Sequence, residues 1–360
     1  MPDAIWIDRQ TALVELAQAL EPQAWIGVDT EFLRERTFFP RLCLLQLAAG
    51  GRVWCVDTLR VDTLEPLMAA LTSPRSRKVL HAARQDLEAV YLAGKQVVAP
   101  VFDTQIAAGC IGLKPQIGYA DLVKTLLDVT LAKAHTRTDW SKRPLSAAQL
   151  EYAADDVLYL GEIAARLSSR LAELGRGHWV DEDCAELLDP NLYEPDLARA
   201  WERVRGIAQL APAPRARAKA IAVWRERTAR TRNIPRAWIL PDAALFAIAQ
   251  TEVAALRAPG ALQPLNDELA ARLLPDLERA PAEDAEPGAP QDARPSPEQK
   301  ALMARLAAIV DRRAGELGVS AEILAPRGEL RALALGNRAT HCLGGWRAGE
   351  IGSRLLEALE

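Results

Sequence analysis

Trp25-Ile26-Gly27-Val28-Asp29-Thr30-Glu31-Phe32 is an apolar run that ends in two carboxylates two residues apart. Side chains of a strand alternate between its faces, so Asp29 and Glu31 project from one side of an extended segment, while Ile26 and Val28 are typical of a buried central strand. Two such charges repel and lose hydration, and Mg²⁺ or Mn²⁺ is the natural compensating partner. The alternative is an acidic strand end exposed to water, and this stretch alone leaves both open.

Length and composition are those of an ordinary globular protein. With 360 residues, 49% hydrophobic and 26% charged, the chain is long enough for two or three domains, each with its own core. Its start lacks a secretory signal pattern, and no apolar run approaches a membrane-spanning length. Five scattered cysteines without CxxC spacing indicate neither a zinc site nor a disulfide framework. We therefore expect a cytoplasmic protein that is not inserted in a membrane.

The pattern around the carboxylate strand predicts an α/β sheet of mixed direction, because strands come first in a run and then alternate with helices. The Gly50-Gly51 turn predicts a hairpin. Ser146, after Pro144, is a plausible N-cap for one long helix. The expected strands are 25–32, 42–47, 53–56, 78–80 and 101–103, and the expected helices are 9–20, 64–71, 85–93 and 146–174.

Beyond Trp179 the composition favours helices throughout. We expect a compact helical unit with helices near 196–209, 215–229, 241–257 and 266–279. Residues 281–297, rich in proline and acids, predict a linker. Residues 298–360 predict a second helical unit, which could be a distant copy of the first.

Charge is distributed unevenly in this half. The net charge of −4 argues against a protein that coats nucleic acid through bulk charge. Residues 199–236, however, hold eleven Lys or Arg and only two acids. Such a block suggests an anionic partner, although a solvated helix face is the simpler interpretation of any single residue. Trp201, Trp224 and Trp238 lie among these bases, and we expect them to form the core of the unit rather than to stack on unpaired nucleotides.

Two further segments supply the remaining acids. Asp86 lies in the first turn of an expected helix directly after a strand, and Tyr152 and Asp156 lie four residues apart on one helix face. Taken singly, Asp86 suits a helix N-terminus, Tyr152 suits a core, and Asp155-Asp156 suits a solvated edge.

Together the segments resemble the DEDD exonuclease superfamily: Asp-x-Glu at a strand end, an Asp at a helix start, then Tyr-x-x-x-Asp. The tyrosine form is typical of the DEDDy branch, whereas the histidine form would need His in place of Glu151. The flanking segments 139–145 and 149–157 are similar to those of the ribonuclease D family. This resemblance covers roughly residues 3–175, and the following helical unit resembles an HRDC domain.

The resemblance implies an RNase H-like mixed-sheet exonuclease domain over 1–180, followed by all-α HRDC-type domains. These would be an HRDC domain over 195–280, a linker over 281–297 and a second HRDC-like domain over 298–360. It also assigns Asp29, Glu31, Asp86, Tyr152 and Asp156 as catalytic. The four acids would bind two divalent metal ions, Mg²⁺ or Mn²⁺, which activate water and stabilise the leaving oxygen.

Tyr152 would orient the attacking water, since its ordinary pKa near 10 does not suit a general base. His81 and Asp155 stay outside the ligand set, and His81 is expected to be satisfied by a backbone partner. No organic cofactor is expected.

The implied activity is a hydrolytic 3′→5′ exoribonuclease that trims tRNA precursors and other structured RNA 3′ ends and releases nucleoside 5′-monophosphates. We expect a monomer. Two alternatives stay open: a DNA-preferring DEDDy exonuclease, because residues do not show the 2′-OH contacts, and a catalytically inactive RNA-binding protein. The five intact motif residues argue against the second alternative.

Overall fold

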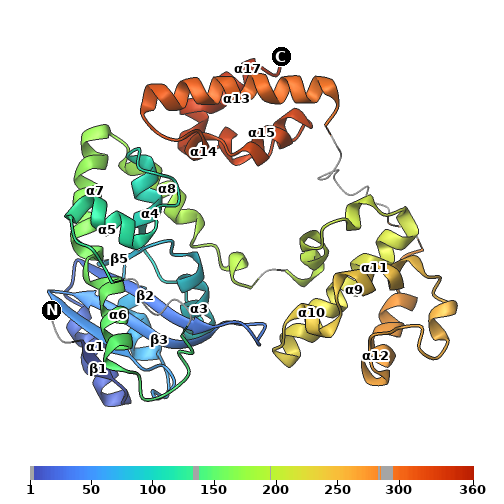
Figure 1. Ribbon diagram of the computed structural model, residues 1–360, viewed down its shortest axis with the longest axis horizontal. Coiled ribbons are helices and arrows are strands. Elements are labelled where there is room, and N and C mark those ends of the chain that lie inside the picture. The colour runs from blue at the N-terminus through green and yellow to red at the C-terminus, as the bar shows by residue number, and fades with distance from the viewer. Residues whose placement is uncertain (1–3, 133–137, 195, 283, 285–294) are drawn as a thin grey trace. The chain divides into compact units, whose positions relative to one another are not determined.

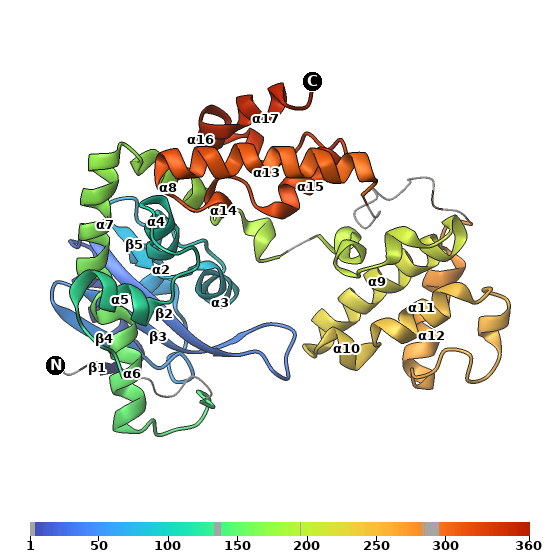
Figure 2. The same cartoon turned by 45° about the horizontal axis from the view of Figure 1, so that its top comes forward.

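The computed structural model describes residues 4–132, 138–194, 196–282, 284 and 295–360 (Figures 1 and 2). Contacts divide the chain into two compact units, each described here by itself. Unit 1 comprises residues 1–33, 41–189 and 295–360; unit 2 comprises residues 34–40 and 190–294. Most of the expected linker at 281–297 lies outside the described residues.

A six-stranded sheet of mixed direction organises unit 1, as expected, in the order β1-β4-β3-β2-β5-β6. The pairs β2–β3 and β3–β4 are antiparallel, and β1–β4, β2–β5 and β5–β6 are parallel. Gly50 and Gly51, both at positive φ, form the predicted hairpin turn. The strands are β1 (Ile5–Ile7), β2 (Trp25–Leu33), β3 (Arg41–Ala49), β4 (Arg52–Val56), β5 (Arg77–Leu80) and β6 (Val101–Asp103). Of these six strands, only β1, which is three residues long, was not predicted from the sequence.

Helices pack against both faces of this sheet. Because Gly27, Asp29 and Glu31 alternate with Thr30, the first three lie on one face of β2 and Thr30 on the other. The Gly27 face meets α6 and α7, whereas Thr30 meets α3. The helices of the α/β domain are α1 (Gln10–Leu20), α2 (Glu65–Leu71), α3 (Arg84–Gly94), α4 (Thr104–Cys110), α5 (Tyr119–Leu127), α6 (Ala147–Leu158), α7 (Leu160–Leu174) and α8 (Gly177–Glu186).

The prediction of a single helix over 146–174 is wrong. Ser146 does form the N-cap, with a capping box to Gln149. The helix is interrupted at Tyr159, however, and divides there into α6 and α7. The physical cause is a tyrosine from another element, described below, which no periodicity in this segment reveals.

Unit 2 is helical, as expected, but less regular at its start. The helix expected over 196–209 is two 3₁₀ segments, Leu197–Arg203 and Ile207–Gln209, because Val204 is extended and Gly206 lies at a φ of +99°. The helix expected over 241–257 is shorter and ends at Gln250. The α-helices are α9 (Pro212–Arg232), α10 (Arg236–Ile239), α11 (Asp242–Gln250) and α12 (Asp267–Glu278).

A repeat relates these helices to the C-terminal ones. A 21-residue helix with a left-handed C-cap, a four-residue helix, a proline and a third helix occur twice in the same order. Every start is displaced by 85 residues: from 212 to 297, from 236 to 321 and from 242 to 327. The C-terminal helices are α13 (Pro297–Leu317), α14 (Ala321–Leu324), α15 (Arg327–Ala334), α16 (Gly345–Arg347) and α17 (Ser353–Glu357).

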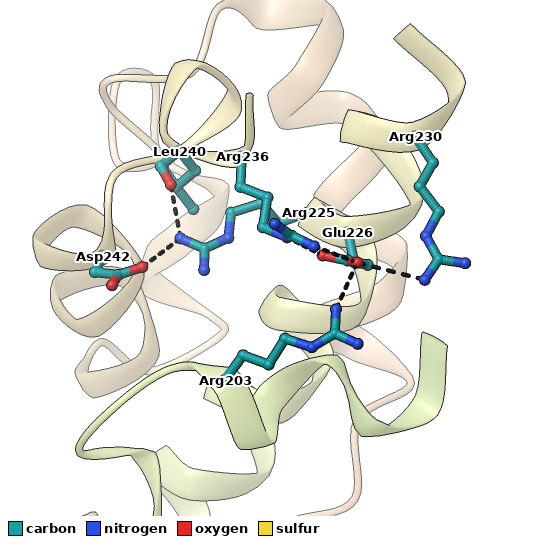
Figure 3. A network of polar contacts seen from close by, with 7 residues as sticks. All are labelled: Arg203, Arg225, Glu226, Arg230, Arg236, Leu240 and Asp242. Atoms are coloured by element: carbon teal, nitrogen blue, oxygen red, sulfur yellow. Dashed lines mark hydrogen bonds and ion pairs between the residues drawn. The ribbon is translucent and has the colours of Figure 1, made fainter. Parts of the chain in front are cut away.

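Most basic side chains of the 199–236 block pair with acids of their own unit. Glu226, buried in α9, binds three of them, Arg203, Arg230 and Arg236, while neighbouring Arg225 binds Asp242 and the Leu240 carbonyl (Figure 3). Within the described ranges, Arg205 is the one base of the block without an ion pair. The basic block therefore neutralises acids of its own unit. Fewer of its positive charges are available to an anionic partner than the count of Lys and Arg indicates.

The three tryptophans of unit 2 do not share one environment. Trp224 is buried, and Trp201 is half-buried with the Lys219 ammonium 4.1 Å from its ring. Trp238 is 61% exposed, so the expectation that it belongs to the core is wrong. The repeat makes Ile323 its counterpart, and Ile323 packs against Gly109 of α4. The equivalent position thus packs against α4 in the C-terminal copy, as Ile323, and is exposed to solvent in the first copy, as Trp238.

The C-terminal helices share a core with the α/β domain inside unit 1. The rings of Trp179 and Trp346 stack with centroids 4.0 Å apart. Beside them the Arg347 guanidinium donates to both carboxylate oxygens of Asp183, at 2.6 and 2.8 Å. None of the helices in the described ranges has the length and apolar character needed to span a bilayer.

Replacing Arg347 with Met should destabilise unit 1 by about 3 kcal/mol, because it leaves the nearly buried Asp183 carboxylate without its cationic partner, with only the Trp346 indole N–H still donating to it. The matched control is Arg354→Met, which removes an exposed pair to Glu316 at 3.5 Å and should cost less than about 1 kcal/mol. Urea unfolding followed by tryptophan fluorescence measures both. Equal decreases in the free energy of unfolding of the two variants would contradict a stabilising role for the buried Arg347–Asp183 pair.

Candidate active site

The first two predicted site residues lie near the end of β2. Asp29 pairs across the sheet with Gln46 and Glu31 with Leu44, and the regular register to β3 is interrupted directly after Glu31. Both carboxylates lie on the Gly27 face and are half-buried. The strand therefore presents them side by side, as its alternation predicted, at a place that solvent still reaches.

Asp86 reaches the site from the opposite face of the sheet. It lies in the first turn of α3 and is 8% exposed. One of its carboxylate oxygens accepts a short hydrogen bond from the Thr30 hydroxyl. Thr30, between the two strand acids, is thus a contact residue that sequence reasoning missed, although its central position in Asp-Thr-Glu was the available signal.

Tyr152 and Asp156 come from α6 and hydrogen-bond to each other, consistent with their four-residue spacing. The Tyr152 ring stacks on buried Trp140, with centroids 6.1 Å apart. Trp140 belongs to the segment 139–145, which resembles the corresponding segment of the ribonuclease D family. Its position now has a physical role, because it supports the ring that carries the Tyr152 hydroxyl.

Arg143 holds that segment in place. Its guanidinium binds the fully buried Asp57 carboxylate through two hydrogen bonds, of 2.7 and 2.8 Å, and also donates to the Cys43 and Trp140 carbonyls. Asp57 follows β4 and Cys43 lies in β3, so the segment is attached to β3, the neighbour of β2, and to β4 beyond it. Sequence reasoning missed Asp57, since nothing local distinguishes it.

Burial and repulsion from neighbouring carboxylates raise the pKa of all four acids, and for Asp86 the repelling carboxylate is that of Asp103. Burial is the larger cause in each case, and it raises the pKa of Asp29 well above its ordinary value. The pKa of Glu31 rises to about 8, and those of Asp86 and Asp156 to about 7. Neighbouring carboxylates raise these pKa values further. No Lys, Arg or His of the described ranges forms an ion pair with any of the four.

The donor set fits divalent cations chemically. Four carboxylates without a cationic side chain are the oxygen ligands that Mg²⁺ and Mn²⁺ prefer. The fully buried amide of Gln46, paired with Asp29 across the sheet, has no hydrogen-bond partner on its nitrogen or oxygen in the described structure. As they stand, no three His, Cys, Asp or Glu side chains of the described residues form a ready-made metal site. Carboxylates that are too far apart to share one ion are expected here, because like charges repel without metal and the Asp86 carboxylate is turned towards Thr30.

The remaining predictions concern His81 and Asp155. His81 is held between the Thr104 hydroxyl and the Ile117 carbonyl, both at 2.9 Å, so the expected backbone partner is confirmed. The pKa of Asp155 is also raised, mainly by burial and then by Glu151, and its carboxylate in turn raises the pKa of the adjacent Asp156. The backbone carbonyl of Asp155 is engaged by Tyr119.

Comparisons with known proteins agree with this arrangement. Residues 4–172 match the family model described as 3′-5′ exonuclease, and residues 215–257 match the HRDC domain. Ribonuclease D of Acidiphilium cryptum is 37% identical over 99% of this chain and 93% of its own length; that of Pseudomonas paraeruginosa is 35% identical over 100% and 98%. The crystal structure of Escherichia coli RNase D, described as an exoribonuclease involved in structured RNA processing, covers 99% of this chain and 98% of its own, with 28% identity and a TM-score of 0.85.

The raised pKa values predict how pH affects the metal-free protein. The folded-state pKa of Asp156, about 7, exceeds its ordinary value of 3.8, so unfolding releases a proton and stability falls as pH rises between about 4 and 7. Asp156→Asn removes this penalty. In EDTA, the Tm of the variant should therefore exceed that of wild type by more at pH 8 than at pH 5.

Thermal melts with and without Mn²⁺ measure this difference, and exposed Asp62→Asn is the control. Added Mn²⁺ should raise the Tm of wild type more than that of Asp156→Asn, because only a protein that binds the ion is stabilised by it. A Tm difference that is independent of both pH and Mn²⁺ would refute the electrostatic account.

Proposed function

The chain belongs to the ribonuclease D family and is a 3′→5′ exoribonuclease, and we propose that it trims the 3′ ends of structured RNA such as tRNA precursors. The observation that carries the proposal is the gathering of Asp29, Glu31, Asp86 and Asp156 beside Tyr152. RNA in structured form is the substrate class given for the E. coli relative. The enzyme requires a divalent metal, as its family does, and we propose two ions of Mg²⁺ or Mn²⁺ held by these four acids.

When bound, such ions neutralise the scissile phosphate and lower the pKa of the attacking water. Water then attacks the phosphorus, the bond to the 3′ oxygen breaks, and a nucleoside 5′-monophosphate leaves an RNA shortened by one residue. The protein contributes placement: β2 holds Asp29 and Glu31, α3 holds Asp86, and α6 holds Asp156 and Tyr152.

Tyr152 serves as the residue that orients water in this proposal. Burial, and then the neighbouring carboxylates, raise its pKa further above its ordinary value, so the hydroxyl keeps its proton. A hydroxyl that keeps its proton donates and accepts hydrogen bonds but does not act as a general base near neutral pH. Stacking on Trp140 limits the directions in which this hydroxyl can point.

We infer that residues 195–280 and 298–360 are two HRDC-type copies with different tasks. The constant displacement of 85 residues supports common ancestry. The second copy uses Ile323 to pack on the α/β domain, whereas its counterpart in the first, Trp238, is exposed. An exposed indole is a suitable platform for an unpaired base, so we propose that Trp238 contacts RNA beside the helical region of the substrate.

The five cysteines are free and buried, which suits the reducing cytoplasm that we propose as its location. The monomeric state stays a prediction.

Replacement of Asp156 by Ala should abolish release of labelled mononucleotide from 3′-labelled tRNA-like RNA in Mg²⁺ or Mn²⁺, while RNA binding persists. The matched control, Asp155→Ala, removes the adjacent carboxylate and should retain activity. A single-stranded DNA of equal length tests sugar preference. Full activity in Asp156→Ala would refute the site. Faster cleavage of DNA would refute the substrate class, and tight RNA binding without any wild-type cleavage would refute an active enzyme.

Trp238→Ala should raise the KM for structured RNA about tenfold, which corresponds to the loss of one stacked base. The kcat, and cleavage of a single strand too short to reach the first helical domain, should stay at wild-type values because the variant leaves the carboxylates untouched. The control is Val14→Ala, another exposed apolar residue. An unchanged KM for structured RNA would exclude the stacking role.

A further inference from the structure

The helix that carries Tyr152 and Asp156 is interrupted by a side chain from another element. In a regular helix the Tyr159 amide would donate to the Asp155 carbonyl, four residues earlier. Here the Tyr159 amide donates instead to the Tyr119 hydroxyl, at 3.3 Å, and also contacts the Val157 carbonyl. The same hydroxyl donates to the Asp155 carbonyl, at 3.1 Å. Tyr119 is thus inserted into one rung of the hydrogen-bond ladder.

Such insertion is a recognised cause of helix kinks. Tyr159 has φ −98° and ψ −5°, outside the usual helical range, and regular helix resumes with Ile163 bonded to the Tyr159 carbonyl. The hydroxyl satisfies both backbone groups that the kink releases, so neither is left unpaired at a buried place. The interruption is therefore stable only while Tyr119 supplies a group that both donates and accepts.

Tyr119 itself is held firmly. It is the first residue of α5, and its ring lies 5.6 Å from that of His81. The Ile117 carbonyl, two residues before it, accepts hydrogen bonds from the His81 ring and from the Gln105 amide, at 2.9 and 3.0 Å. His81, which the proposed chemistry does not use, thereby fixes the segment that presents Tyr119.

The kink lies directly over β2, the strand that carries Asp29 and Glu31. A methyl group on Gly27 would come within 3.3 Å of the Val157 carbonyl and 3.4 Å of Leu160 Cβ. Val157 follows Asp156, and Gly27 lies on the same face as Asp29. On one side of this point α6 contacts β2, β3 and β4; on the other, α7 contacts β2, β3 and β5. The direction of α6 across the sheet therefore changes at the place where Tyr119 is inserted.

We propose that Tyr119 is a positioning residue of the active site, whose hydroxyl sets the direction of α6 and so places Asp156 and Tyr152 against Asp29 and Glu31. The inference rests on the proposed roles of those residues in metal binding and catalysis. In this proposal Tyr119 acts through the backbone at Asp155 and Tyr159.

A purely structural role makes a different prediction. If Tyr119 only filled space, phenylalanine would replace it with little effect on chemistry, because the ring and its contact with His81 would remain. If the hydroxyl directs α6, then in Tyr119→Phe the Tyr159 amide either donates to the Asp155 carbonyl or keeps only its contact with the Val157 carbonyl. Either outcome shifts the carboxylate of Asp156, and a shift of about 1 Å in an active-site group costs up to about 100-fold in rate.

The experiment compares wild type, Tyr119→Phe and Tyr159→Phe. The last variant removes a nearby hydroxyl but keeps the Tyr159 amide, so it serves as the control. We expect Tyr119→Phe to lower kcat about 10- to 100-fold with an unchanged KM for RNA, and to weaken Mn²⁺ binding measured calorimetrically without RNA. Tyr159→Phe should match wild type in all three quantities. Melting curves establish that each variant is folded at the assay temperature.

The proposal is overturned if Tyr119→Phe retains both wild-type kcat and wild-type Mn²⁺ affinity, or if its activity recovers fully when stability is restored at lower temperature. Because Mn²⁺ binding is measured apart from cleavage, an inactive wild type would refute the proposed function while the comparison of affinities still tests Tyr119.

Gly27→Ala tests the direction of α6 independently of Tyr119, because its added methyl group would press on the Val157 carbonyl from β2. Gly161→Ala, whose methyl group would meet only the Trp25 ring at 3.5 Å, is the matched control. A lower kcat in Gly27→Ala, together with activity in Gly161→Ala, supports control of the reaction by the direction of α6. Unchanged kcat in both would contradict it.

Discussion

Four carboxylates held close together in a partly dry place repel one another, and the α/β domain is built to resist that repulsion. No side-chain cation of the described residues neutralises them, and burial raises the pKa of each. The free energy that keeps them together must come from elsewhere in the fold, and from divalent cations once these bind. A site that is unfavourable without metal is one that binds metal strongly.

The scaffold meets this constraint with hydrogen bonds and ring stacking around the acids. Thr30 holds Asp86, Trp140 holds Tyr152, and the Arg143–Asp57 pair holds the segment of Trp140. On α6 the corresponding contacts are made to the main chain, by Tyr119 and over Gly27. Thr30 donates directly to one Asp86 oxygen, whereas the other contacts fix a direction and leave the carboxylate oxygens of the site unoccupied.

The helical copies show how one local architecture takes two roles. In the C-terminal copy, Ile323 and Trp346 pack on the α/β domain, and Arg347 binds Asp183. In the first copy, the counterpart of Ile323 is Trp238, which is exposed, and the arginines surround Glu226 instead (Figure 3). Side-chain identity at equivalent backbone positions thus decides whether a face is buried or free.

The sequence by itself determined the mixed sheet and the helical second half, which follow from strand alternation, helical spacing and turn residues, all properties of neighbours along the chain. Alternation and spacing also placed Asp29 with Glu31 and Tyr152 with Asp156, whereas the grouping of all five site residues, Asp86 included, followed from the resemblance to the DEDD exonucleases. The tertiary structure alone decided the break at Tyr159, the exposure of Trp238 and the internal pairing of the arginines. These features depend on residues far apart in sequence. The Tyr119 hydroxyl, for example, accepts a hydrogen bond from an amide forty residues later, and the sequence of α6 contains no pattern that predicts a contact with a side chain of α5.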